Sequence, residues 1–464
     1  MVKDVPSIEY LCSLVHELWQ RVEQQQQQID KLTAENARLT EDNQQLKTQL
    51  EQARTEVARQ AAPFRRPERK KIAKDKQKRS GRPVGHPGVN RPVPDHIDEF
   101  ITVPLDVCPH CGGPVANCLP HEQYIEEIPP VKPHVIKLTT FRGRCGQCGD
   151  VASTHPLKTG KGYLASQVHL GPRALALAAT LNKQHGLSMR KTCRVLNDMC
   201  GLKLSAGGLS QALDRLADRL EPDYQGLFVD LRAGPATYVD ETSWWVGGPG
   251  HWLWVFTNPT TTLFQVEDRR SPAVVTEVLT PTYTGVLVSD CLNIYDAVPF
   301  ERKHKCIAHH QKAIREQLDS TGLRDRTYLE SWRAFFREVC ELRKHWHELP
   351  EDERNAARED LGRRKNELLW RKCSQPEDKK IANRLRKQAP HLLTCLNRPD
   401  DVESTNNRAE RALRPAVIAR KVSCGNKTER GKTTWQVLTS LLATWWQRGQ
   451  EAVAHLTSRA GGVG

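Results

Sequence analysis

Apolar residues recur every three or four positions from Ile8 to Val57, which is a heptad pattern. Its a positions are Ile8, Val15, Val22, Ile29, Asn36, Asn43, Leu50 and Val57, and its d positions are Leu11, Leu18, Gln25, Leu32, Leu39, Leu46 and Ala53. The pattern predicts a coiled coil over residues 1–60, and asparagine at two a positions favours a parallel dimer. The alternative is a single amphipathic helix on its own protein, but the repeat is longer than one domain face.

After Pro235 the pattern becomes that of β-strands. Three consecutive strands are predicted at Thr237–Val246, His251–Phe256 and Thr262–Val266, with glycine, asparagine and proline in the turns between them. Ser271 is expected to cap a helix that runs to Leu279, and the apolar run from Gly285 ends at Asp290 as a fourth strand. This order predicts an α/β fold with an RNase H-like core at residues 226–310 and 400–450.

Two further regions have helical periodicity. Within residues 161–225, helices are predicted at Arg173–Leu181, Met189–Asn197 and, after a cap at Ser205, Leu209–Leu220. They fit an HTH-like DNA-binding region whose last helix lies in a major groove, and they fit an ordinary three-helix packing unit equally well. Residues 311–399 predict a charged helical insertion. Its expected packed face is Trp332, Phe335, Phe336, Leu342, Trp346, Leu368, Leu369 and Trp370.

The composition predicts the kind of partner and the cellular compartment. The 464 residues carry a formal charge of +14, which favours a polyanion such as DNA, and they contain no apolar run long enough for a membrane span. No export signal precedes the fourteen cysteines, so reduced or metal-bound thiols in a soluble, cytoplasmic protein are expected. Residues 451–464 are predicted to be a C-terminal tail.

A basic, Pro/Gly-rich linker is predicted at residues 61–100. Arg65–Arg82 holds ten basic residues against two acids, a composition that cannot form a packed core. Its candidate DNA-binding residues are Arg65, Arg66, Lys70, Lys71, Arg79 and Arg82. The following Gly81–Gly88 could lie in a minor groove or be a plain solvated linker.

Four cysteines form two CxxC pairs, Cys108 with Cys111 and Cys145 with Cys148. The two-residue spacing lets both thiolates of a turn face one ion, and a glycine after each second cysteine relieves the backbone. Four sulfurs complete a tetrahedral site, so a structural Zn²⁺ is predicted within a zinc-binding domain at residues 101–160. Strands are expected between the pairs, at Tyr124–Lys137.

Three acids fall where strands and a helix of the predicted core would meet. Asp240 lies within the first strand, Asp290 ends the fourth, and Glu410 lies on a short helix that Pro415 is expected to stop. Converging carboxylates repel unless cations neutralise them, so Mg²⁺ (or Mn²⁺) and phosphodiester chemistry are predicted. Glu241 points to the opposite strand face, so one of the two must face away from the metal site.

The motifs Asp240-Glu-Thr, Ser289-Asp290, Cys306-Ile-Ala-His309 and Asn406–Pro415, behind a coiled coil and a CxxC pair, resemble the DDE transposases of the insertion sequence 66 family. The resemblance runs from about Ile8 to Trp446. It implies that Asp240, Asp290 and Glu410 are catalytic and bind metal, and that the segment between Cys306 and Glu410 is an insertion into the core. Arg411 and Arg414 are candidate DNA contacts, and the roles of His309 and His310 stay open.

What this resemblance implies is a transposase that cleaves the ends of its mobile element and joins their 3′-hydroxyls to target DNA. Accessory proteins encoded in the same element are further implied partners. The alternative is a catalytically inactive, dimeric, zinc-containing DNA-binding protein or regulator. That alternative accounts for the coiled coil, the linker and the cysteines, and it leaves the three acids unexplained.

Overall fold

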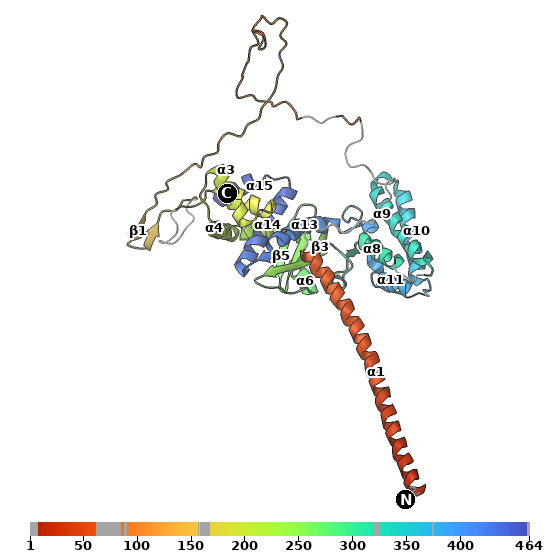
Figure 1. Cartoon of the computed structure of the whole chain (residues 1–464). Helices are drawn as coiled ribbons and strands as arrows, with labels where there is room; N and C mark the ends of the chain where they lie inside the picture. Colours follow the sequence, from red (N-terminus) through yellow and green to blue (C-terminus); the bar gives the residue numbers. More distant parts are fainter. Residues whose placement is uncertain are drawn as a thin grey trace. The chain divides into compact units, whose positions relative to one another are not determined.

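The structure is a computed structural model that describes residues 8–61, 85–87, 91–155, 157, 168–319, 324–373 and 375–461. The chain divides into two compact units, Met1–Asn90 and Arg91–Gly464. In the first unit, α1 (Ile8–Ala61) is one long, uninterrupted helix over the predicted heptads (Figure 1). Apolar residues of its heptads are exposed, for example Val22 (57% exposed) and Ile29 (55% exposed). The predicted helix is therefore present, and its pairing with a second chain stays a prediction.

The basic linker residues Arg65–Arg82, with all six candidate DNA contacts, lie outside the described residues. Their prediction is neither supported nor weakened by the structure. Among the helices that the structure describes, none is both long and apolar enough to pass through a bilayer.

A mixed sheet forms the centre of the second unit. Its strands are β3 (Ala236–Val246), β4 (His251–Thr257), β5 (Thr262–Glu267), β6 (Val286–Ser289), β7 (Lys303–Lys305) and β8 (Gly425–Asn426). The order is β5-β4-β3-β6-β7, with β8 beside the far end of β3. The first three strands pair antiparallel, and β6 pairs parallel with both β3 and β7. This mixed α/β arrangement is the expected one and is consistent with an RNase H-like core.

The pleat of β3 gives the sheet two different faces. Ala236, Tyr238 and Trp244 point into a core shared with the insertion and with α13 (Asn407–Ser423). Val239 points into the other core, which contains α6 (Pro272–Leu279) and α14 (Glu429–Gln447). Because side chains alternate along a strand, neighbouring residues of β3 meet different surroundings.

The insertion is helical, as predicted. Its elements are α8 (Ile307–Leu318), α9 (Thr327–Lys344), η3 (Trp346–Glu348), α10 (Glu351–Trp370), α11 (Pro376–Lys387), η4 (Ala389–His391) and α12 (Thr394–Asn397), and the longer helices pack together beside the sheet (Figure 1). Trp332, Phe335 and Phe336 are fully buried. Trp370 is 77% exposed, so its assignment to the packed face was wrong. It ends α10 one helical step past buried Leu369, and that step turns its ring away from the core.

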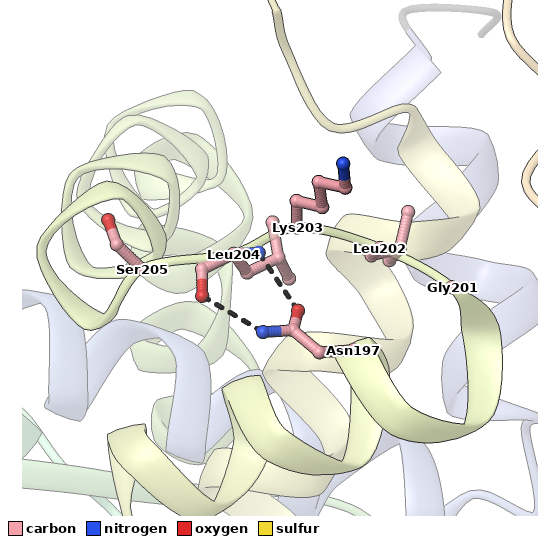
Figure 2. Close-up of a pocket in the computed structure, with 6 residues that line it drawn as sticks. All are labelled: Asn197, Gly201, Leu202, Lys203, Leu204 and Ser205. Atoms are coloured by element: carbon pink, nitrogen blue, oxygen red, sulfur yellow. Dashed lines mark hydrogen bonds between the residues drawn. The ribbon is translucent and has the colours of Figure 1, made fainter.

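The helical region before the sheet contains α2 (Pro172–Ala179), a π-helical turn η2 (Thr180–Gln184), α3 (Met189–Cys200), α4 (Ala206–Arg219) and α5 (Glu221–Ala233). Ser205 caps α4 through the backbone N–H of Gly208, as predicted. Asn197 bonds both backbone groups of Leu204 and thereby braces the turn between α3 and α4, where a shallow hollow lies (Figure 2).

Helix α4, the third of the predicted helices, packs on α14. Thr434 of α14 donates to Asp214 of α4, and Arg430 pairs with Asp218 at 2.5 Å. This contact fits the three-helix packing unit, and a role as an HTH stays a prediction.

Three local predictions were wrong. Pro415 lies inside α13 and does not stop it, because buried Leu413 and Ala416 on either side anchor the helix to the sheet. Residues 452–461 form α15 (Ala452–Gly461), which packs on α2 with Leu456 buried, where a tail was expected. Tyr124–Lys137 contains no strand; the strands of this region are β1 (Arg142–Cys145) and β2 (Gly149–Ala152), a hairpin around the second cysteine pair.

Candidate functional site

Asp240 lies at the middle of the sheet. It follows the stretch of β3 that pairs with β6, and it shares a strand face with Tyr238. Its Oδ1 accepts the backbone N–H of Glu241 at 2.9 Å. Burial raises the pKa of Asp240 to about 8, and the charges of Glu241, Asp290 and Glu410 add to the rise. Among the residues that the structure describes, Asp240 makes no ion pair with a basic side chain, so its charge is left uncompensated.

Glu241 has the opposite surroundings. Its side chain is 2% exposed, and Arg270 pairs with it at 2.6 Å. Tyr295 donates its hydroxyl to the same carboxylate, and the Arg270 guanidinium lies 4.3 Å from the centre of the Trp252 ring. Burial raises the pKa of Glu241, while the bonds from Tyr295 and Arg270 oppose that rise. Glu241 is thus a partnered structural acid on the face away from Asp240.

Asp290 follows the last residue of β6, next to β3 in the sheet. Its Oδ1 accepts the backbone N–H of Leu292 at 2.9 Å, which holds the carboxylate in a tight turn. Because the carboxyl end of β6 lies beside the middle of β3, the charge of Asp290 acts on Asp240.

Glu410 is carried by α13, which is tied to β3 at both ends. At its start, Asn406 donates to the carbonyl of Val239 at 2.9 Å; near its end, Arg420 donates to Thr242 at 2.7 Å. These two bonds lay the helix along the Asp240 face of the sheet. Glu410 lies in the first turn of α13, and its charge acts on Asp240.

The carboxylates are in electrostatic range but do not form the tightest cluster. In the described part of the chain, a single group of metal-binding side chains has its ligand atoms within 4.8 Å of one another, namely Cys306, His309 and Glu410. The Nδ1 of His309 lies 3.8 Å from Glu410. Asp240 and Asp290 stand outside this group.

Three histidines lie close together in the sequence, His304, His309 and His310, and their surroundings differ. His304 is buried, with Nε2 3.2 Å from the carbonyl of Ser404, and burial lowers its pKa to about 4. His310 stacks on Phe336 with ring centres 5.3 Å apart, and burial lowers its pKa well below the ordinary value. Both are neutral packing residues. His309, beside Glu410, is the one that faces the acids.

The cysteine pairs form two separate knuckles. Gly112 and Gly149, each directly after a second cysteine, have φ values of +74° and +75°, as the glycine argument predicted. Backbone hydrogen bonds from His110 and Cys111 lower the pKa of Cys108, and bonds from Cys148 and Gln147 lower that of Cys145. The four sulfurs are not brought together in the structure, since no three of these described cysteines form a close group.

Sequence reasoning missed several residues that build this site. Arg270, Tyr295 and Asn406 hold or orient the acids through bonds to Glu241 and Val239. Lys305 pairs with Asp296. Local sequence carries little signal for these pairs, because the partners lie far apart along the chain.

A sheet of this order, with acids on two adjacent central strands and a third on a helix laid across them, is consistent with the RNase H-like cores of DDE enzymes. The sequence model of the Transposase IS66 family matches residues 167–434, more than half of the chain. The chain therefore belongs to the IS66 transposase family. It is also 24% identical to the uncharacterized protein y4qI of Sinorhizobium fredii (strain NBRC 101917 / NGR234), with 84% of this chain and 76% of that protein covered.

Proposed function

We propose that this transposase cleaves the ends of its own mobile element and joins their 3′-hydroxyls to target DNA, with Asp240, Asp290 and Glu410 as its catalytic acids. The observation that carries the proposal is the state of Asp240. It is a buried carboxylate without a cationic partner in the described chain, it faces two further acids, and its pKa is raised to about 8. A protein rarely leaves a buried acid in this state unless a ligand compensates it.

The residues fit a hard divalent cation. Asp240, Asp290 and Glu410 offer oxygen donors, which Mg²⁺ and Mn²⁺ prefer. When bound, such ions activate a water or a 3′-hydroxyl and stabilise the leaving oxygen of a phosphodiester. Cys306 and His309 beside Glu410 are softer donors, and burial raises the pKa of Cys306, which favours its neutral thiol.

The chain's own groups orient the acids and receive DNA. Asn406 and Arg420 hold α13 against β3, so that Glu410 is presented to Asp240. Arg411 and Arg414 are exposed on the same helix, where they can contact phosphates that approach the acids. We propose the same role for the basic linker, from Arg65 to Arg82.

The decisive experiment uses DNA duplexes that carry the terminal repeats flanking the gene. Glu410→Gln and Asp290→Asn are expected to lose Mg²⁺-dependent strand transfer by about 10³-fold and to keep DNA binding. Glu403→Gln is the matched control, because Glu403 pairs with Arg408 at 2.6 Å in the same segment and lies outside the acid group. A wild-type protein that binds the repeats and never cleaves them would support an inactive DNA-binding regulator instead.

Two accessory roles belong to the N-terminal part. We propose that α1 pairs two chains in parallel, which would cover its exposed apolar stripe; deletion of residues 1–61 should then halve the mass measured by light scattering. We also propose that the two cysteine knuckles close around one structural Zn²⁺, since lowered thiol pKa values favour the thiolates that zinc binds.

A further inference from the structure

Lys305 is a fully buried cation directly behind the acids. We propose that it is a positioning residue for Asp290, and that the helical insertion controls this position through Gln388 and Asp296. The proposal rests on the proposed function, because it treats Asp290 as a metal-binding acid. It assigns the insertion a role in the chemistry in addition to packing.

All three donors of the Lys305 ammonium have a partner. Its Nζ lies 2.8 Å from Oδ1 of Asp296, 3.3 Å from Oγ of Ser289 and 3.5 Å from the backbone oxygen of Asp290. Lys305 is 0% exposed, so these contacts replace water completely. Ser289 donates its hydroxyl to the same Asp290 carbonyl at 2.9 Å. One buried cation therefore holds the peptide that carries the Asp290 side chain.

Asp290 is restrained at two groups, its carboxylate and its backbone carbonyl. Leu292 N–H holds the Oδ1 atom, while Lys305 and Ser289 hold the backbone oxygen. Loss of the ammonium would remove one of the two contacts to this carbonyl and leave the Ser289 hydroxyl as its partner, which would loosen the restraint on the peptide. A buried ion pair is a poor source of net stability, but it does select one geometry.

The insertion contacts Asp296 through Gln388. Gln388 ends α11, is 2% exposed, and donates its Nε2 to both oxygens of Asp296 at 3.1 and 3.2 Å. Lys303 donates to the backbone oxygen of Asp296 at 2.8 Å. The path from Gln388 through Asp296 and Lys305 to Asp290 is continuous; Gln388 and Lys305 are buried, and the Asp296 side chain between them is 29% exposed. It joins a helix of the insertion to an acid of the core.

A matched pair of glutamines tests the path. Gln375 begins α11 and Gln388 ends it, and Gln375 bonds only groups within the insertion, including the backbone N–H of Arg324 at 2.9 Å. Gln388→Ala and Gln375→Ala should cost the helix similar stability, but only Gln388→Ala removes a bond to Asp296. Gln388→Glu places a like charge against Asp296 and should have the larger effect.

Two readouts are measured on the full-length protein: kcat and KM for Mg²⁺-dependent cleavage of repeat DNA, and Mn²⁺ binding by electron paramagnetic resonance without DNA. Gln388→Ala is expected to lower kcat about 10-fold and to weaken Mn²⁺ binding several-fold, with KM for DNA unchanged. Lys305→Met should lower kcat about 100-fold. Gln375→Ala should match the wild type in both readouts.

Equal effects of Gln388→Ala and Gln375→Ala on Mn²⁺ affinity and kcat would overturn the inference, and this comparison stands even if Lys305→Met fails to fold. A different failure marks the proposed function. If Asp240→Asn in the otherwise wild-type protein leaves the affinity for Mn²⁺ unchanged, the acids do not form the metal site, and both proposals are wrong.

Discussion

Asp240 and Glu241 are consecutive acids on β3, but their side chains lie on opposite faces of the sheet and have different partners. Glu241 is 2% exposed and held by Arg270 and Tyr295. Asp240 has a single backbone N–H bond, and the charges of Glu241, Asp290 and Glu410 act on it. The same chemical group thus has a cationic partner on one face of the sheet and, among the described residues, none on the other.

The comparison teaches how to separate a structural acid from a functional one. Burial alone raises the pKa of both carboxyls, so burial does not distinguish them. A cationic partner within the fold does distinguish the two carboxyls. Glu241 has its counter-charge in Arg270, whereas Asp240 has none among the described residues, which fits the catalytic role proposed for it.

The largest expected effect is on catalysis. Asp240→Asn should reduce strand transfer by about 10³-fold or more, because a metal ligand is lost. Glu241→Gln should keep activity within about 10-fold, since Gln can still accept from Arg270 and Tyr295. Both are compared in the same Mg²⁺-dependent assay. Equal loss in the two variants would end the distinction between the faces.

The next largest effect is expected on the free energy of unfolding, through the partner of Glu241. Arg270→Met leaves a buried carboxylate without its cation and should lower the free energy of unfolding by about 3 kcal/mol, at the low end for a buried pair because Arg270 is partly exposed. Arg269→Met is the matched control. Arg269 pairs with Glu277 at the surface, with both side chains about half exposed, so its loss should cost less than ~1 kcal/mol. Urea unfolding measures both.

An effect of opposite sign is expected on the Asp240 face. The folded chain keeps a proton on Asp240 up to a pKa of about 8, whereas the unfolded chain releases it near its ordinary value of 3.8. The unfolding free energy contributed by this group therefore falls as pH rises between those values.

Asp240→Asn removes that penalty and should be more stable than the wild type at pH 8.5 without metal, and the gain should shrink towards pH 5. Added Mg²⁺ should stabilise the wild type and not the variant. Thermal unfolding at several pH values tests this. A wild type that is the more stable at pH 8.5 without metal would show that Asp240 has an internal partner.

The smallest effect on the core is expected from the cysteine knuckles. Cys145→Ser should lose bound zinc and destabilise residues 101–160, with little change in unfolding of the sheet. Cys118→Ser is the control, because Cys118 is exposed and outside the CxxC spacing. Zinc content by mass spectrometry and hydrogen exchange of the two regions report the result; retained zinc in Cys145→Ser would argue against the four-cysteine site.

Local pattern was enough to predict much of the core. The strands, the Ser205 cap and the opposite orientation of Asp240 and Glu241 follow from strand alternation and capping, which depend on neighbours in sequence. The path of α13 through Pro415 was not predictable in this way, since packing of Leu413 and Ala416 overrides the missing N–H.

The partners of the acids were also beyond local pattern. Arg270 meets Glu241 and Lys305 meets Asp296 only after the sheet has formed, and nothing in the short run Lys303–Lys305 marks a buried cation. Helix α15 was not predicted because its sequence has few apolar residues, and these become buried only by packing on α2 in the folded chain. Tertiary context, and not propensity, decided each of these cases.

The insertion leaves and rejoins the core at one point. The backbone N–H of Ile307 donates to the carbonyl of Ser404 at 3.1 Å, and the N–H of Asn406 donates to the sulfur of Cys306. Chain entry and exit are thus clamped together, so the position of Glu410 is independent of how many residues lie between them. Insertions and deletions within that segment can accumulate in evolution while the third acid keeps its place.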